Sequence, residues 1–422
     1  MDRLAKFGGP QACPPGTVPP WPQWGDDEVA RLCSVLESGK WWRVAGREVE
    51  SFEREFASFH GCREALAVSS GTDALELALS SIGVGPGDEV VVPAFTFCAT
   101  ATAVLAVGAI PVAADIDAET YCLSPSSARQ AITSRSRAIV PVHLAGHPYD
   151  IEAIEEIAEE HGLAVVADAA HAHGARWRNT SVAGLCRASI YSFQAMKLLT
   201  AGEGGALVSD DPDLMERAWL LHTSGRPRGD RSYRHLALAG NARMTEFQGA
   251  ILRAQLRRLP AQLGAREEGG RRLDAAVASI QGLRVLRRHP GVTLHSNYMY
   301  IIELDEHLAG VRDEVVDLLA VEGVPAFRAY RALPDLELFV EDALQRGLPP
   351  AADPHRVREA IARVKVPHAR AASRRSLWLH HSVLLGAPSI QEKVGVALAK
   401  VAAYARSGAL ENDAVPMMKS GR

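Results

Sequence analysis

Lysine is scarce in this sequence. The chain of 422 residues has 46 basic residues, of which only seven are lysines, and Lys197 is the only lysine between Lys40 and Lys365. Arginine therefore supplies almost all of the positive charge. Arginine cannot replace lysine where the chemistry needs an amine, because its guanidinium group keeps its proton in proteins. The isolation of Lys197 indicates a position that requires an amine.

The sequence also lacks paired cysteines, long apolar segments and an excess of positive charge. The six cysteines include no C-x-x-C pair and no paired spacing, which argues against a zinc site or a disulfide framework and favours a reduced, cytoplasmic compartment. No apolar run approaches the roughly 20 residues of a membrane span, and the proline-rich start lacks the apolar core of a signal peptide. The net charge of −4 supplies no positive field for nucleic acid or an anionic membrane. We expect neither as a partner.

The order of apolar runs predicts an α/β fold. Short runs such as EVVVPAF alternate with helical stretches, which is typical of a mostly parallel sheet with helices on both faces. We expect a proline-rich arm (1–20), a large domain (21–262), a smaller C-terminal α+β domain (263–405) and a flexible tail (406–422). Ligands of such sheets bind at the carboxyl ends of the strands. The segments that follow the apolar runs are 70–72, 95–97, 143–146, 168–171 and 192–197.

Gly71 and Thr72 lie where a strand is expected to turn into a helix. The free N–H groups and the dipole at a helix start bind phosphate, and the Thr72 hydroxyl adds a further donor. A helix cap by Ser70 or Thr72 explains the same residues without any ligand. Both interpretations stay open from this motif alone.

Asp168 ends the apolar run AVVAD, where an acidic group needs a partner because burial of an unpaired charge is costly. A cationic ring nitrogen, as in pyridoxal phosphate enzymes, is one such partner, and a cap of the next segment is the alternative. His171 and His173 lie two residues apart, but no third ligand has a spacing that suggests a metal site. We expect no metal.

Lys197 follows the apolar run ASIYSF, within the stretch SFQAMKLLTAGEGG, and a solvated surface lysine is the alternative to a reactive one. A lysine made neutral by burial forms a Schiff base with an aldehyde and then moves protons. The phosphate cradle, the aromatic pair Phe95 and Phe97, the acid Asp168 and Lys197 occur in the order that pyridoxal phosphate chemistry requires. Their conjunction is more informative than any one of them.

Four motifs resemble those of the DegT/DnrJ/EryC1/StrS aminotransferases, which are fold-type I pyridoxal phosphate enzymes with a large and a small domain. The motifs are SGTDAL at Ser70–Leu75, GDEVVVPAFTF at Gly87–Phe97, DAAHAHGA at Asp168–Ala175 and SFQAMKLLTAGEGG at Ser192–Gly205. The resemblance covers residues 20 to 405. A lysine at position 197 argues against the dehydratase branch of the family that carries histidine there.

The resemblance implies roles for the residues around the cofactor ring. Lys197 would bind pyridoxal 5′-phosphate covalently and act as the catalytic base and acid. Asp168 would contact the pyridine nitrogen, Phe97 would stack on the ring, and His171 would lie near the cofactor face or its phenolic oxygen.

The resemblance also implies how the phosphate is held. Gly71, Thr72 and Ser192 would bind it from one subunit. In the segment GNARMTEFQGA, Asn241 would reach the phosphate of the other subunit. The protein would then be an obligate homodimer with shared active sites.

Two subgroups of the family share further segments with this chain. SGKWWRVAGREVESFEREFA and WLHHSVLLG resemble 3-amino-5-hydroxybenzoate synthase, which removes water from an aminated ring and aromatises it. PVHLAGHPYDI and the SFQ segment resemble scyllo-inosose and other aminocyclitol aminotransferases. We expect an aminotransferase that moves nitrogen from glutamine or glutamate to a keto cyclitol or related sugar in secondary-metabolite, aminocyclitol or antibiotic biosynthesis. The alternatives are the synthase reaction and a non-catalytic regulator on the same fold.

Substrate contacts are expected at the entrance of the site. Arg226 and Arg228 in SGRPRGDR, and Tyr298 in HSNYMY, are the candidates. Solvation of an arginine-rich loop explains the two arginines equally well.

Overall fold

A seven-stranded sheet forms the centre of the molecule. The computed structural model describes residues 3–340, 344 and 353–408. Neighbouring strands of this sheet pair in parallel except at β9, which is antiparallel to β1 and β8. The order along the sheet is β1 (Glu64–Val68), β9 (Gly205–Ser209), β8 (Ala188–Ser192), β5 (Ala164–Asp168), β4 (Ser136–Ile139), β2 (Glu89–Pro93) and β3 (Ile110–Ala114). The predicted α/β fold with a mostly parallel sheet is confirmed.

Helices cover both faces of the sheet, and side-chain caps fix where several of them begin. Ser70, Ser124, Asp150 and Asp211 each accept a hydrogen bond from a backbone N–H of the first turn that follows. The helices are α2 (Glu48–His60), α3 (Gly71–Ser81), α4 (Ala99–Ala106), α5 (Pro125–Ala131), α6 (Ile151–His161) and α7 (Pro212–His222).

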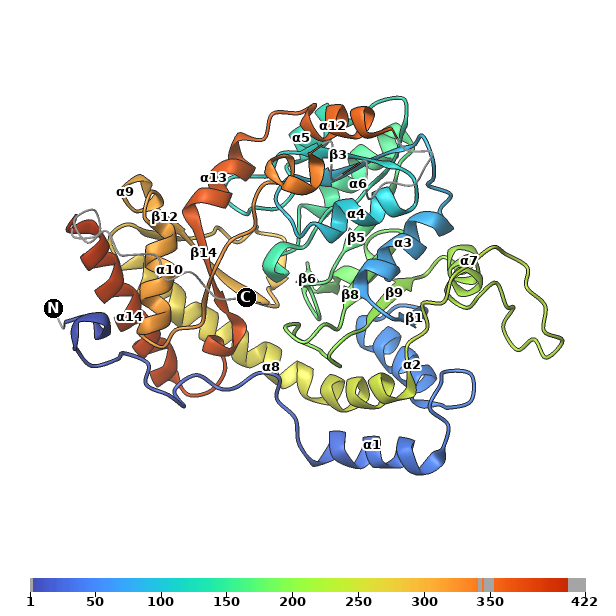
Figure 1. Cartoon of the computed structure of the whole chain (residues 1–422), viewed down its shortest axis with the longest axis horizontal. Helices are drawn as coiled ribbons and strands as arrows, with labels where there is room; N and C mark the ends of the chain where they lie inside the picture. Colours follow the sequence, from blue (N-terminus) through green and yellow to red (C-terminus); the bar gives the residue numbers. More distant parts are fainter. Residues whose placement is uncertain (1–2, 341–343, 345–352, 409–422) are drawn as a thin grey trace.

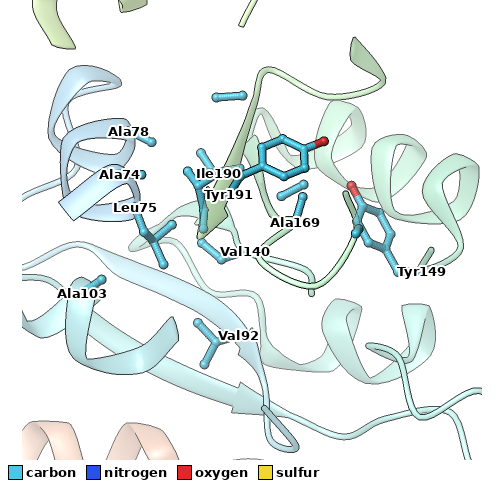
Figure 2. Packing of buried hydrophobic residues seen from close by; sticks show 14 of the residues in the cluster. Ala74, Leu75, Ala78, Val92, Ala103, Val140, Tyr149, Ala169, Ile190 and Tyr191 are labelled. Carbon is cyan, nitrogen blue, oxygen red and sulfur yellow. The ribbon is translucent and has the colours of Figure 1, made fainter. Parts of the chain in front are cut away.

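The uninterrupted apolar character of the strands follows from this double cover. Every residue of β2, β3 and β9 is buried. Figure 2 shows Ala74, Leu75 and Ala78 of α3 directed toward Ile190 of β8, on one face of the sheet. Full burial of a side chain such as Leu75 stabilises the fold by about 1.5–3 kcal/mol. The packing fixes α3 against β8, the two elements whose ends form the candidate site.

A second, antiparallel sheet lies on the other side of the molecule, next to α10 and α14 in Figure 1. Its order is β10 (Leu283–Val285), β12 (Met299–Leu304), β14 (Ser376–His380) and β13 (Ala326–Arg328). The helices beside it are α9 (Glu306–Ala309), α10 (Arg312–Val321) and α14 (Pro388–Arg406). These elements bury a hydrophobic cluster of their own.

The 33-residue helix α8 (Glu246–Ala278) runs from the large sheet to the second one, and α1 (Asp26–Ser38) packs along it (Figure 1). After β13 the chain returns to the large sheet, where α12 (Pro354–Ala362) packs on β3 and is followed by α13 (Pro367–Arg375). The remaining strands form a small sheet of β11 (Val292–Leu294), β6 (Arg176–Trp177) and β7 (Thr180–Ser181). The 3₁₀ helices are η1 (Ala5–Phe7), η2 (Leu144–Gly146), η3 (Val182–Gly184), η4 (Leu333–Asp335), η5 (Glu337–Phe339) and η6 (His381–Leu384).

The division into domains near residue 262 stays a prediction. Helix α14 ends at Arg406, and most of the predicted tail, residues 409–422, lies outside the described residues. Within the described part of the chain, no helix combines the length and the apolar character that a membrane span requires.

Candidate active site

A cavity of about 360 Å³ opens at the carboxyl ends of β5 and β8, beside the start of α3. Four of the five segments predicted from the strand ends contribute to its wall, and residues 143–146 do not. The lining residues that carry polar groups or aromatic rings are Ser70, Thr72, Thr96, Phe97, Asp168, His171, Ser192, Gln194, Lys197, Glu203, Tyr298 and Tyr330. The cavity is large enough for a substituted six-membered ring with a phosphate.

The start of α3 presents the first side of the cavity. Ser70 caps the helix by accepting a hydrogen bond from the Asp73 N–H at 3.0 Å, so the cap alternative is correct for Ser70. The N–H groups of Gly71 and Thr72 precede the first intrahelical bond and stay available for an anion. A Cβ added at Gly71 would lie only 2.8 Å from Cβ of Ser192. The glycine therefore lets the Ser192 hydroxyl approach the helix start.

Asp168 lies at the end of β5 with its carboxylate held by two donors. The Thr100 hydroxyl donates to Oδ2 at 2.9 Å, and the Ala170 N–H donates to Oδ1 at 3.1 Å. Among the described residues, no basic group lies within ion-pair distance of it. Burial raises the pKa of Asp168, while the Ala170 and Thr100 hydrogen bonds and the charge of Lys197 oppose the rise. A cationic group in the cavity would supply the missing partner.

Lys197 reaches the same cavity from the turn that follows β8. Its Nζ lies 4.3 Å from the ring centroid of Tyr298, a cation–π distance. No hydrogen bond or ion pair from its amine is found within the described parts of the chain. Burial lowers the pKa of Lys197 to about 8, and the charge of Asp168 acts in the opposite direction. The surface-lysine alternative is wrong, because Lys197 is only partly exposed, lines the cavity and has an amine with a lowered pKa.

His171 is a buried, neutral side chain. The Ala145 N–H donates to its Nδ1 at 3.2 Å, which places the ring proton on Nε2. Its ring stacks on Tyr298 with centroids 4.2 Å apart and an interplanar angle of 23°. Burial holds the pKa of His171 well below its usual range, and the charge of Lys197 lowers it further. Among the residues that the structure describes, no group of three His, Cys, Asp or Glu side chains could hold a metal ion.

The other sequence candidates lie at the rim or outside the cavity. Phe97 is 54% exposed, and its ring lies 5.9 Å from that of Tyr330. Asn241 is exposed and does not line the cavity of its own chain.

Of the three residues predicted to contact the substrate, the structure places one in the cavity and two outside its wall. Arg226 and Arg228 lie over the rings of Tyr233 and Trp219 and are absent from the cavity wall. Tyr298 is only 5% exposed and lies inside the cavity, where an entrance position was expected.

Two site residues escaped prediction from the sequence. Thr100, on α4, anchors Asp168, although nothing in the local pattern TFCAT separates it from an ordinary helix residue. Tyr330 follows β13 of the second sheet and lines the same cavity, with its ring 4.6 Å from that of Trp378. Only the packing of the second sheet on the first could reveal it.

A partly buried lysine, a buried carboxylate and a free helix start at one edge of a mostly parallel sheet are the arrangement of a fold-type I pyridoxal phosphate enzyme. The sequence model of the DegT/DnrJ/EryC1/StrS aminotransferase family matches residues 22–396. The chain belongs to this family, whose enzymes use pyridoxal phosphate.

Two named relatives and one solved structure show which members of the family this chain is similar to. The chain is 43% identical over 375 residues to 3-amino-5-hydroxybenzoate synthase of Amycolatopsis mediterranei, a match that covers 88% of this chain and 94% of the relative. It is 35% identical over 400 residues to L-glutamine:2-deoxy-scyllo-inosose aminotransferase of Streptomyces fradiae, covering 91% and 94%. The crystal structure of a 3-amino-5-hydroxybenzoic acid synthase matches with a TM-score of 0.84 and 41% identity, covering 92% of this chain and 98% of that one.

Proposed function

We propose that this enzyme removes water from an aminated six-membered carbocycle and aromatises it, the reaction that the resemblance to 3-amino-5-hydroxybenzoate synthase implies. The sequence alone favoured transamination. The higher identity to the synthase, 43% against 35% for the aminotransferase, now favours the other reaction. The structural observation that carries the proposal is the enclosed amine of Lys197, with its pKa lowered to about 8, in a cavity that also holds the buried Asp168.

The residues present fit pyridoxal phosphate. We assign the phosphate to Gly71, Thr72 and Ser192 at the start of α3, and the ring nitrogen to Asp168. The unpaired carboxylate of Asp168 and the free N–H groups of α3 are the two features that such a ligand would satisfy. When bound, the cofactor would withdraw electrons from the substrate carbon that carries the amino group.

The surrounding side chains then orient and protonate the substrate. Phe97 and His171 are assigned to the cofactor ring, and the Nε2–H of His171 is available as a donor at the cavity wall. Lys197 takes a proton from a ring carbon at its Nζ and returns a proton to the hydroxyl that leaves as water. An amine with a pKa near 8 performs both steps close to neutral pH.

The test is a reaction without an amino donor. Purified enzyme loaded with pyridoxal phosphate is incubated with an amino-dehydroshikimate ring, and the product is followed by aromatic absorbance and by mass. We expect loss of water and an aromatic amine, and no reaction with Lys197→Ala. An unchanged substrate, with turnover only after glutamine is added, would refute the proposal.

Amination of a keto cyclitol is the second candidate. It rests on the 35% identity to the glutamine-dependent aminotransferase. Glutamine or glutamate alone should then convert the yellow protein to the form that absorbs at shorter wavelength, and a scyllo-inosose should return the yellow colour. A protein that stays colourless with added cofactor would instead indicate a regulator without catalytic activity.

We also propose a homodimer with shared active sites. Trp41 and Trp42 are 52% and 48% exposed, and Trp42 pairs with Thr245 close to the exposed Asn241. Large apolar side chains that remain exposed next to one another are a feature of interaction surfaces. We assign Asn241 to the phosphate of the partner's site. The six cysteines are free, which supports our proposal of a cytoplasmic location. The similarity to the synthase supports a role in secondary metabolism.

A further inference from the structure

Two backbone carbonyls immediately before Lys197 are held by side chains from distant parts of the chain. The indole Nε1–H of Trp21 donates to the carbonyl oxygen of Ala195 at 3.1 Å. The Nε2 of His381, the first residue of η6 directly after β14, lies 3.2 Å from the carbonyl oxygen of Met196. The two rings meet edge to face, with centroids 4.4 Å apart and an interplanar angle of 86°. The turn that carries the reactive amine is therefore fixed from outside its own segment.

The fully buried Arg266 of α8 sets the direction of the second hydrogen bond. Its Nε and Nη2 both donate to Nδ1 of His381 at 3.3 Å, so the only ring proton of a neutral His381 is on Nε2, facing Met196. Burial, and then the charge of Arg266, hold the pKa of His381 well below its usual range. The imidazole is thus kept as a neutral donor of fixed orientation.

Arg266 itself has an unusual environment. Its side chain is 0% exposed, and no carboxylate among the described residues pairs with it. Its Nη1 has no hydrogen-bond partner in the described structure, and its guanidinium lies 5.2 Å from the centroid of the Trp21 ring. Burial lowers the pKa of Arg266 to about 9. Because a buried cation without a carboxylate is costly, its presence points to a role that stability does not explain.

In the structure, the segment before α1, residues 3–25, continues the predicted proline-rich arm (1–20) past Trp21. We call this whole segment the arm, and it is held by hydrogen bonds on both sides of Trp21. Before Trp21, the Glu322 carboxylate accepts the N–H groups of Ala5 at 2.8 Å and Ala12 at 2.9 Å, and Lys400 donates to the Pro10 carbonyl at 3.0 Å. Figure 1 shows the arm passing from the second sheet, past α8, to α1.

After Trp21, the Gln23 carbonyl accepts from Gln255 at 2.7 Å and from Arg258 at 3.1 Å, both on α8. The arm is therefore held by hydrogen bonds to the rest of the chain both before and after Trp21.

We propose that Trp21, His381 and Arg266 form a positioning unit that holds the turn of Lys197 and keeps its amine enclosed beside Asp168. Arg266 fixes the tautomer of His381, His381 and Trp21 fix the two carbonyls, and the anchored arm fixes Trp21. The catalytic use of this unit rests on the proposed function, but the restraint on the turn exists without cofactor or substrate.

Hydrogen exchange of the cofactor-free protein tests the restraint separately from any activity. The amides of Ala195, Lys197 and Ala201 are hydrogen-bonded within the turn and report on its opening. Trp21→Phe keeps an aromatic ring but removes the N–H donor, so we expect these amides to exchange about fivefold faster, the ratio that one net hydrogen bond supports. Trp24→Phe is the matched control, because Trp24 is a 75% exposed residue of the same arm. Equal exchange in Trp21→Phe and the wild type would overturn the proposal.

A pair of His381 variants tests the effect on the amine. Gln at position 381 can accept from Arg266 and donate to Met196, whereas Phe can do neither. The rate at which pyridoxal phosphate reacts with Lys197, trapped by borohydride and located by peptide mass, is measured against pH. We expect a midpoint near the wild-type pKa of about 8 for His381→Gln and a clearly higher midpoint for His381→Phe. An unshifted midpoint in His381→Phe would show that the amine does not depend on this unit.

Discussion

Replacing Lys197 by methionine should stabilise the cofactor-free protein at neutral pH. The pKa of Lys197 falls from 10.5 to about 8 in the fold because burial penalises the charged amine. At about 1.36 kcal/mol per pKa unit, this depression lowers the free energy of unfolding below pH 8 by up to about 3 kcal/mol. Methionine has a similar length and no charge, so Lys197→Met removes that penalty. The partial exposure of Lys197 and its contact with Tyr298 both reduce the gain.

The pH dependence of the gain has a definite sign. Between the folded pKa of about 8 and the unfolded value of 10.5, the unfolded state binds more protons, so the stability of the wild type rises with pH. The advantage of Lys197→Met should therefore be largest below pH 8, decrease to about 2 kcal/mol at pH 9 and vanish above about pH 11. Urea unfolding of both proteins at one protein concentration and a series of pH values measures it.

Lys400→Met is the matched control. Lys400 is also buried, but it pairs with Glu322 at 2.9 Å, so its removal leaves a carboxylate without its partner. We expect this variant to be destabilised by about 3 kcal/mol or more. If Lys197→Met were equally destabilised at pH 7, or if its advantage did not fall with rising pH, the amine would not be the enclosed, penalised group described above.

Three further predictions concern the cofactor and the dimer. Thr100→Val removes the hydroxyl that holds Asp168, so pyridoxal phosphate should bind about tenfold more weakly in a dialysis titration, and Thr100→Ser should restore binding. Gly71→Ala should weaken cofactor binding by about tenfold or more, because the added Cβ would clash with Ser192. The control is Gly264→Ala, on an open face of α8, which should leave binding unchanged and raise the free energy of unfolding by about 1 kcal/mol. Mixing Lys197→Ala with Asn241→Ala should restore activity to at most about one quarter of the wild type, because half of the subunits pair as heterodimers with one intact site. No recovery after mixing would refute the shared site.

Local sequence pattern predicted the central sheet and most of the cavity wall for a physical reason. A parallel strand buried on both faces reads as a continuous apolar run, and the residues that follow it must lie at the ligand-binding edge. Gly71, Asp168, Ser192 and Lys197 are all placed by this rule, and each lines the cavity.

The residues that escaped prediction depend on contacts between distant segments. Thr100 acts through Asp168, which lies 68 positions away, and Tyr330 reaches the cavity only because the second sheet packs against the first. The roles of Trp21 and His381 escaped prediction for the same reason. The two residues come from distant segments, and their rings contact each other beside the turn of Lys197. Strand periodicity contains no information about such contacts, because they are set by how the two sheets and the arm dock.

Charge without a partner marks this site independently of any motif. Elsewhere in the described structure, Glu53 is paired with Arg43 and Glu322 with Lys400. The partly buried Lys197 and the buried Asp168 and Arg266 lack an ion-pair partner among the described residues, yet they gather around one turn. A fold selected for stability alone would have neutralised or paired them, since each one lowers the free energy of unfolding. Their retention is explained if Lys197 and Asp168 are completed by a charged ligand and Arg266 by the orientation that it imposes on His381.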